Sequence, residues 1–99
     1  MNTIVNIQNT VVGSTFISED TRLAGTIVGP VEVIGLTKFE LNGSVIGNLT
    51  INKGSEVHIL GTVHGDVINE GGILQVFGMI NGHLIKNGGE TFVSPAAMV

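Results

Sequence analysis

A seven-residue motif, Gly-x-(Ile/Val)-x-Gly-x-(Val/Leu), occurs four times in this chain of 99 residues. The copies begin at Gly25, Gly43, Gly61 and Gly78, so their starts are 18, 18 and 17 residues apart. A repeat this short, without a helical pattern inside it, is typical of a solenoid in which each repeat forms one β coil and stacks on the next. The repeat constrains the fold more than any other feature of the sequence.

Apolar residues recur at every sixth position across these repeats. They are Ile27, Val33, Phe39, Val45, Ile51, Val57 and Val63. Three such positions in each coil predict three short strands and a roughly triangular cross-section. Apolar residues two positions away, such as Val31 and Ile59, complete the alternation of a strand with one buried face.

The predicted fold is therefore all-β, a single-domain parallel β-helix of about five coils. Residues 14–93 are expected to form the β-helix, and residues 1–13 form either a loose tail or a ragged first coil. Residues 94–99 are expected to be a short tail, because Pro95 stops regular strand pairing.

The motif glycines are expected to stack in two columns, where the backbone turns a corner or approaches its neighbour closely. A third column of corner glycines is predicted beside turn residues such as Asn and Lys. Its members are Gly35, Gly54, Gly71 and Gly88.

One coil is a residue shorter than those before it, and the motif alignment places the loss between Gly65 and Gly71. Asn69 and Lys86 then fall on the inward column. Either this face turns polar, or the neighbouring Ile68 and Ile85 rotate inward. We expect the second arrangement, because an unpaired lysine inside a solenoid would be costly.

The lead-in Ser14–Gly25 and the motif copies at Gly43, Gly61 and Gly78 resemble the bactofilins, the polymer-forming cytoskeletal proteins of bacteria. The resemblance covers roughly residues 14–93. It implies a right-handed parallel β-helix and nucleotide-independent, end-to-end filaments with a scaffolding role. The chain departs from the family in lacking long polar or proline-rich flanks and in having fewer coils.

Charge and cysteine content exclude several classes of function. The formal net charge of −4, with only four Lys or Arg, argues against a nucleic-acid partner, which needs a basic surface. The absence of Cys excludes disulfides and thiolate metal sites and fits a reducing cytoplasm. No apolar run is long enough to span a membrane, and residues 1–13 do not read as a secretory signal.

Residues 1–13 are nevertheless rich in apolar side chains such as Ile4, Val5 and Ile7. They suggest a membrane-surface association, but the segment has no Lys, Arg or aromatic anchor, which makes this the weaker interpretation. We expect a cytoplasmic protein, with a peripheral position at the inner membrane as the alternative.

The sequence predicts no catalytic, cofactor-binding or metal-binding residue. His58, His64 and His83 occupy different positions within their coils, so they are not expected to converge on a metal. A hexapeptide-type acyltransferase shares the six-residue period, but the small residues that such enzymes place after the inward aliphatic are missing here, which leaves it a remote alternative. Asp66 and His83 share one position in adjacent coils and are expected to pair weakly.

Two sets of residues are predicted to form contact surfaces. A polymer contact is expected because a β solenoid has two open ends, and no helix or charged cap is visible at residues 91–93. Its predicted residues are Thr91, Phe92 and Val93 at one end and Phe16 and Ile17 at the other. Phe92 is expected to lack the cover of a following coil. A lateral apolar patch is predicted from Val28, Ile34, Ile46, Leu60, Ile73 and Phe77.

These observations favour a structural protein that assembles with itself end to end, without catalysis. The alternative from another class is a small binding module, such as an immunity or inhibitor protein that docks a basic partner on its acidic surface. The state of assembly distinguishes them, since the first interpretation predicts filaments of the protein alone.

Overall fold

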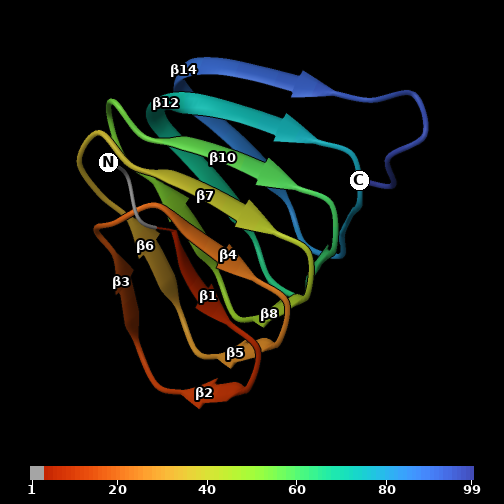
Figure 1. Ribbon diagram of the computed structural model, residues 1–99. Coiled ribbons are helices and arrows are strands. Elements are labelled where there is room, and N and C mark those ends of the chain that lie inside the picture. Colours follow the sequence, from red (N-terminus) through yellow and green to blue (C-terminus); the bar gives the residue numbers. More distant parts are fainter. Residues whose placement is uncertain (1–3) are drawn as a thin grey trace.

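The computed structural model describes residues 4–99, and every regular element in this range is a β-strand. Three strands in each coil form the three faces of a solenoid, and equivalent strands of successive coils pair in parallel (Figure 1). The expected all-β solenoid of about five coils is confirmed. Residues 4–99 contain no helix long and apolar enough to cross a membrane.

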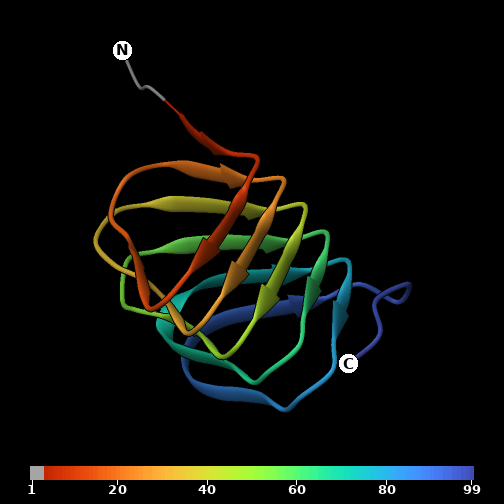
Figure 2. The ribbon, with the colours of Figure 1, turned by 90° about the horizontal axis from the view of Figure 1, so that it is seen from below.

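Each face is a ladder of short strands, seen edge to edge in Figure 2. Face 1 consists of β1 (Val5–Ile7), β4 (Thr21–Leu23), β7 (Lys38–Leu41), β10 (Glu56–Ile59) and the second halves of β12 (Val67–Val76) and β14 (Leu84–Val93). Face 2 consists of β2 (Thr10–Val12), β5 (Thr26–Val28), β8 (Ser44–Ile46), β11 (Thr62–Val63) and β13 (Met79–Ile80). Face 3 consists of β3 (Thr15–Ile17), β6 (Val31–Val33), β9 (Leu49–Ile51) and the first halves of β12 and β14.

The core runs along the axis of the solenoid and is mostly apolar, with Thr21, Thr37, Ser55 and Asn69 as its buried polar residues. All seven residues of the predicted six-residue period are fully buried, and so are their neighbours Val31 and Ile59. Because side chains alternate across a strand, every second residue faces this axis and the others face solvent. The prediction that the six-residue period places one inward residue on each of three faces is confirmed.

Coil length varies at one corner only. The face 1 rungs carry Val5, Thr21, Phe39, Val57, Leu74 and Thr91 in register, which are 16, 18, 18, 17 and 17 residues apart. The inward residues flanking the two other corners stay four residues apart. The corner between faces 3 and 1 therefore absorbs every change in length, and the strands keep their register.

The glycine columns arise from close contact between coils. A Cβ atom on Gly43 would overlap the carbonyl oxygen of Gly25, and one on Gly61 would overlap that of Gly43. The second motif column stacks in the same way and extends back to Gly13. The predicted third column is interrupted, because a Cβ atom on Gly71 would contact Lys53 and not Gly54. In the last coils the close contact is between Gly89 and the carbonyl oxygen of Gly72.

The expectation that Ile68 and Ile85 rotate inward is wrong. Asn69 is fully buried and lies in register with Ile51, whereas Ile68 is half-exposed and Ile85 is exposed. The residue is lost after Asn69, in the variable corner, so the strand before it keeps its register. Lys86 falls in register with Asn69 but is exposed, because it lies in the last coil.

Hydrogen bonds make the buried Asn69 tolerable. Its amide nitrogen lies 3.0 Å from the carbonyl oxygen of Glu90, 3.2 Å from that of Gly72 and 3.1 Å from Thr91 Oγ1. Its Oδ1 accepts the backbone N–H groups of Gly71 at 3.1 Å and Gly72 at 2.8 Å. A buried amide with these partners carries little of the cost of an unpaired polar group.

Residues 5–12 form two strands of a first coil. Strands β1 and β2 pair with β4 and β5, and Ile7 and Val11 pack against the core. Of the two arrangements expected for residues 1–13, the described part is therefore a coil. Residues 1–3 lie outside the described range, as does their part in any membrane association.

Candidate interaction surfaces

The C-terminal end of the solenoid exposes the free edge of β14 on faces 3 and 1. Within the described residues, β14 pairs with β12 alone. The inward residues Leu84, Thr91 and Val93 are half-buried, whereas their equivalents one coil earlier are fully buried. The predicted end residues Thr91 and Val93 therefore lie at this edge and face the axis.

The N-terminal end exposes the free edges of β1, β2 and β3. Each of these strands pairs with a single described strand, β4, β5 and β6 respectively. Ile7 and Val11 are half-buried here, whereas the predicted end residue Ile17 is already buried. Both ends thus combine unpaired backbone with incompletely covered apolar side chains.

Phe92 and Phe16 do not project from the ends of the rod. Each lies between two inward residues of its strand, so alternation turns its ring to the lateral surface. Phe92 is 52% exposed and its ring centroid lies 5.9 Å from that of Phe77, while Phe16 is 65% exposed. Phe92 lacks the cover of a following coil, as expected, but its ring lies on the lateral surface and not at the end where a second copy would stack.

The six residues of the predicted lateral patch are outward or at corners, but they lie on different faces. Val28 and Ile46 are register partners on face 2, and Ile73 lies on face 1 between Glu56 and Glu90. Ile34 follows the end of β6 on face 3 and is half-buried. Leu60 and Phe77 come together at the corner between faces 1 and 2.

Leu60 and Phe77 line a shallow groove of about 250 Å³ near the C-terminal end. Met79, Ala96 and Met98 line it as well. The sequence pattern did not predict the contribution of Ala96 and Met98, because they lie beyond the last repeat, where periodicity carries no signal. The C-terminal segment thus forms part of this surface.

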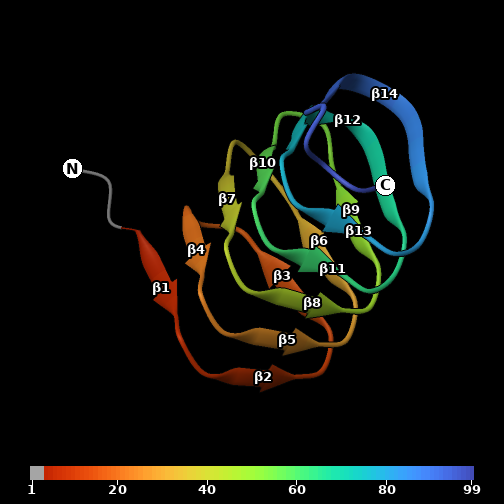
Figure 3. The ribbon, with the colours of Figure 1, turned by 90° about the vertical axis from the view of Figure 1, so that its right-hand side faces the viewer.

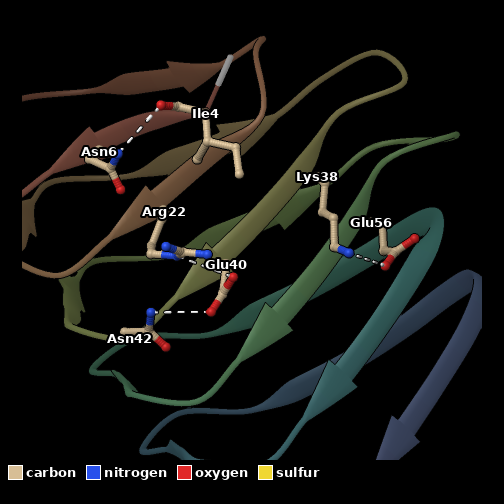
Figure 4. A network of polar contacts seen from close by, with 7 residues as sticks. All are labelled: Ile4, Asn6, Arg22, Lys38, Glu40, Asn42 and Glu56. Atoms are coloured by element: carbon tan, nitrogen blue, oxygen red, sulfur yellow. Dashed lines mark hydrogen bonds and ion pairs between the residues drawn. The ribbon is translucent and has the colours of Figure 1, made fainter. Parts of the chain in front are cut away.

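Charged side chains on face 1 pair along the ladder rather than converging on a site. Arg22 Nε lies 3.4 Å from Glu40 Oε2, and Lys38 Nζ lies 3.8 Å from Glu56 Oε2 (Figure 4). His58 Nε2 lies 2.8 Å from the same Glu56 oxygen, but its geometry is not that of a hydrogen bond. Exposed pairs of this kind contribute little to stability and suggest a solvated face.

The predicted contact between Asp66 and His83 is present, and its stronger part involves the backbone. Asp66 Oδ1 accepts the backbone N–H of His83 at 2.8 Å and lies 3.6 Å from the ring Nδ1. Asn48 Oδ1 accepts the N–H of Asp66 in the same way at 2.9 Å. These residues form a polar ladder along one corner, which ties successive coils together.

His58, His64 and His83 lie on face 1, at the end of face 2 and at the next corner, as their spacing predicted. Among residues 4–99, no group of three or more His, Cys, Asp or Glu side chains is placed to hold a metal ion.

Comparison of the chain with protein-family models, curated proteins and solved structures finds no match.

Proposed function

We propose that this protein is a structural, self-assembling scaffold that polymerises end to end without nucleotide, as the resemblance to bactofilins implies. One observation carries the proposal. The free edges at the two ends have the same strand direction and the same register, so the N-terminal end of one copy fits the C-terminal end of another.

On face 1, the backbone of β1 complements that of β14. The N–H of Val5 donates to the carbonyl of Asp20, and the carbonyl of Ile7 accepts the N–H of Ala24, so Val5 and Ile7 face β4. Asn6 lies between them and directs its N–H and C=O groups to the free side. The column of register partners places this Asn6 next to Phe92 of another copy.

The far edge of β14 offers the matching groups. The N–H of Ser94 donates to the carbonyl of Val76, so Thr91 and Val93 direct their groups away from β12. In a head-to-tail joint, the N–H of Asn6 reaches the carbonyl of Thr91, and the N–H of Val93 reaches the carbonyl of Asn6. Pairing by edge addition is a common basis for recognition between strands.

Apolar cover follows from the same register. Ile7 of one copy would lie over Val93 of the next, and Thr15 would lie over Leu84 on face 3. Burial of a half-covered aliphatic side chain contributes about 1 kcal/mol. Because each joint leaves two free ends, a head-to-tail contact that does not close produces a filament.

Negative-stain electron microscopy and sedimentation of the purified chain test the proposal, and filaments are expected. Ile7→Lys and Val93→Lys each place a charge in the joint, and each variant alone should stay monomeric. An equimolar mixture should form dimers, since one variant keeps an intact C-terminal end and the other an intact N-terminal end. Asn6→Lys and Phe92→Lys, which carry the same charge on the lateral surface, should still assemble.

A chain that stays monomeric at high concentration, both in full and without residues 95–99, would refute the proposal and favour the binding-module interpretation. Dimers of Val93→Lys alone would show instead that like ends join.

A further inference from the structure

The C-terminal segment, residues 94–99, does not leave the molecule as a free tail. It turns back at Pro95 toward face 2 (Figure 3), where Met98 bridges Met79 in parallel. The N–H of Met98 donates to the carbonyl of Gly78 at 2.9 Å, and the carbonyl of Met98 accepts the N–H of Ile80 at 2.8 Å. The segment thus begins one further rung on β13.

This place on β13 is the one that β2 of a second copy would take. The register on face 2 runs through Thr10, Thr26, Ser44, Thr62 and Met79, so the next copy's Thr10 falls where Met98 lies. The N–H of Thr26 donates to the carbonyl of Asn9, and the N–H of Gly13 donates to that of Val28. The groups of Thr10 therefore point to the free side, toward Gly78 and Ile80.

We propose that residues 94–99 cap this end in cis and must leave β13 before another copy can complete the joint. The inference depends on the proposed end-to-end assembly. It identifies β13 as the third contact strand of the joint and the segment as the group that regulates access to it.

The cap is held by few contacts, so another strand can replace it. It holds β13 through one bridge and two backbone hydrogen bonds, and Met98 is 63% exposed. Of its apolar side chains, Ala97 packs against the core and is half-buried. In the joint, Val11 of the second copy falls over Ile80 by register, at the place where the Met79–Met98 bridge puts the 60% exposed Val99.

A disulfide lock tests the inference, because the chain has no cysteine of its own. Met79→Cys with Met98→Cys places two cysteines on register partners. The Cα atoms of such partners are about 5 Å apart, a separation that a disulfide can bridge. The oxidised variant should form at least about tenfold less polymer than the same variant after reduction. Ser44→Cys with Thr62→Cys, a matched pair on the same face at the middle of the rod, should assemble equally in both states.

Deletion of residues 95–99 tests the inference by removing the cap, whereas the disulfide fixes the cap in place. The shortened chain should assemble at a concentration about tenfold lower than the full chain, since the cap no longer competes. Circular dichroism reports whether the shortened chain keeps its strands. If it unfolds, the lock still decides, because that variant keeps the cap at its full length.

The outcomes separate this inference from the proposed function. If the full chain assembles and neither the lock nor the deletion changes the extent of assembly, the inference is wrong. End-to-end polymerisation would then still stand. Failure of the full, reduced and shortened chains to assemble would overturn both. A monomeric full chain whose shortened form polymerises would support the cap directly.

Discussion

For the replacement of Asn69 by leucine, the repeat pattern and the structure predict opposite changes in stability. The pattern favours leucine, since the same column holds Val33 and Ile51, and burying an extra aliphatic side chain contributes about 2–3 kcal/mol. The structure predicts a loss of stability instead. Leucine leaves the N–H groups of Gly71 and Gly72 and the carbonyls of Gly72 and Glu90 without their partner.

The magnitude follows from these four backbone groups. An unsatisfied buried group costs about 1–3 kcal/mol. Because water can reach some of the four groups, we take a total cost of about 6 kcal/mol, below the upper end of this range. After subtraction of the leucine gain, the free energy of unfolding should fall by about 3 kcal/mol. The total for a chain of this length is about 5–15 kcal/mol, so the effect is large.

Urea denaturation of a non-assembling background such as Val93→Lys measures this difference. The melting temperature of the same variant should fall by more than about 10 °C. Ile51→Leu, a change between two aliphatic residues in the same column, is the matched control and should cost less than about 1.5 kcal/mol. An Asn69→Leu chain as stable as its parent would show that Asn69 faces outward and that the corner assignment is wrong.

Three further substitutions test the fold. Gly43→Ala should destabilise the chain by about 2 kcal/mol or more in urea, because its Cβ atom would overlap the carbonyl oxygen of Gly25 in the coil below. Val63→Asp buries an unpaired carboxylate in the central coil and should cost about 3–5 kcal/mol, and an unchanged thermal midpoint would contradict the inward register. Arg22→Ala removes an exposed pair with Glu40 and should change the unfolding free energy by less than about 1 kcal/mol, so a larger loss would show that the face 1 ladder contributes to stability.

Much of the fold was predictable because the determinants of a solenoid are local and repeated. Inward residues such as Val45 and Val63 recur at a constant spacing, and strand alternation turns this spacing into burial. The motif glycines were predictable for a related reason. Stacked coils bring equivalent backbone positions together, so a residue without Cβ is required at the same place in every coil.

The candidate contact surfaces were predictable only in part. Thr91 and Val93 lie at the predicted end, since the last repeat must leave an edge. Phe92 was assigned to that end from its place in the chain, but alternation turns its ring to the side, where it meets Phe77. Position along the chain identifies the last rung, whereas the direction of each side chain also requires the register of that rung.

The amino-acid sequence by itself determined the coil, its three faces, its mostly apolar axis and its two columns of motif glycines, because each depends on residues repeated at nearly constant spacing. Only the tertiary structure decided where the missing residue falls, since the variable corner and the burial of Asn69 depend on Glu90 and Thr91, more than twenty residues away. The return of Met98 onto β13 was decided in the same way. That segment lies outside the repeat, so its path is set by an edge that exists only once the coils have stacked.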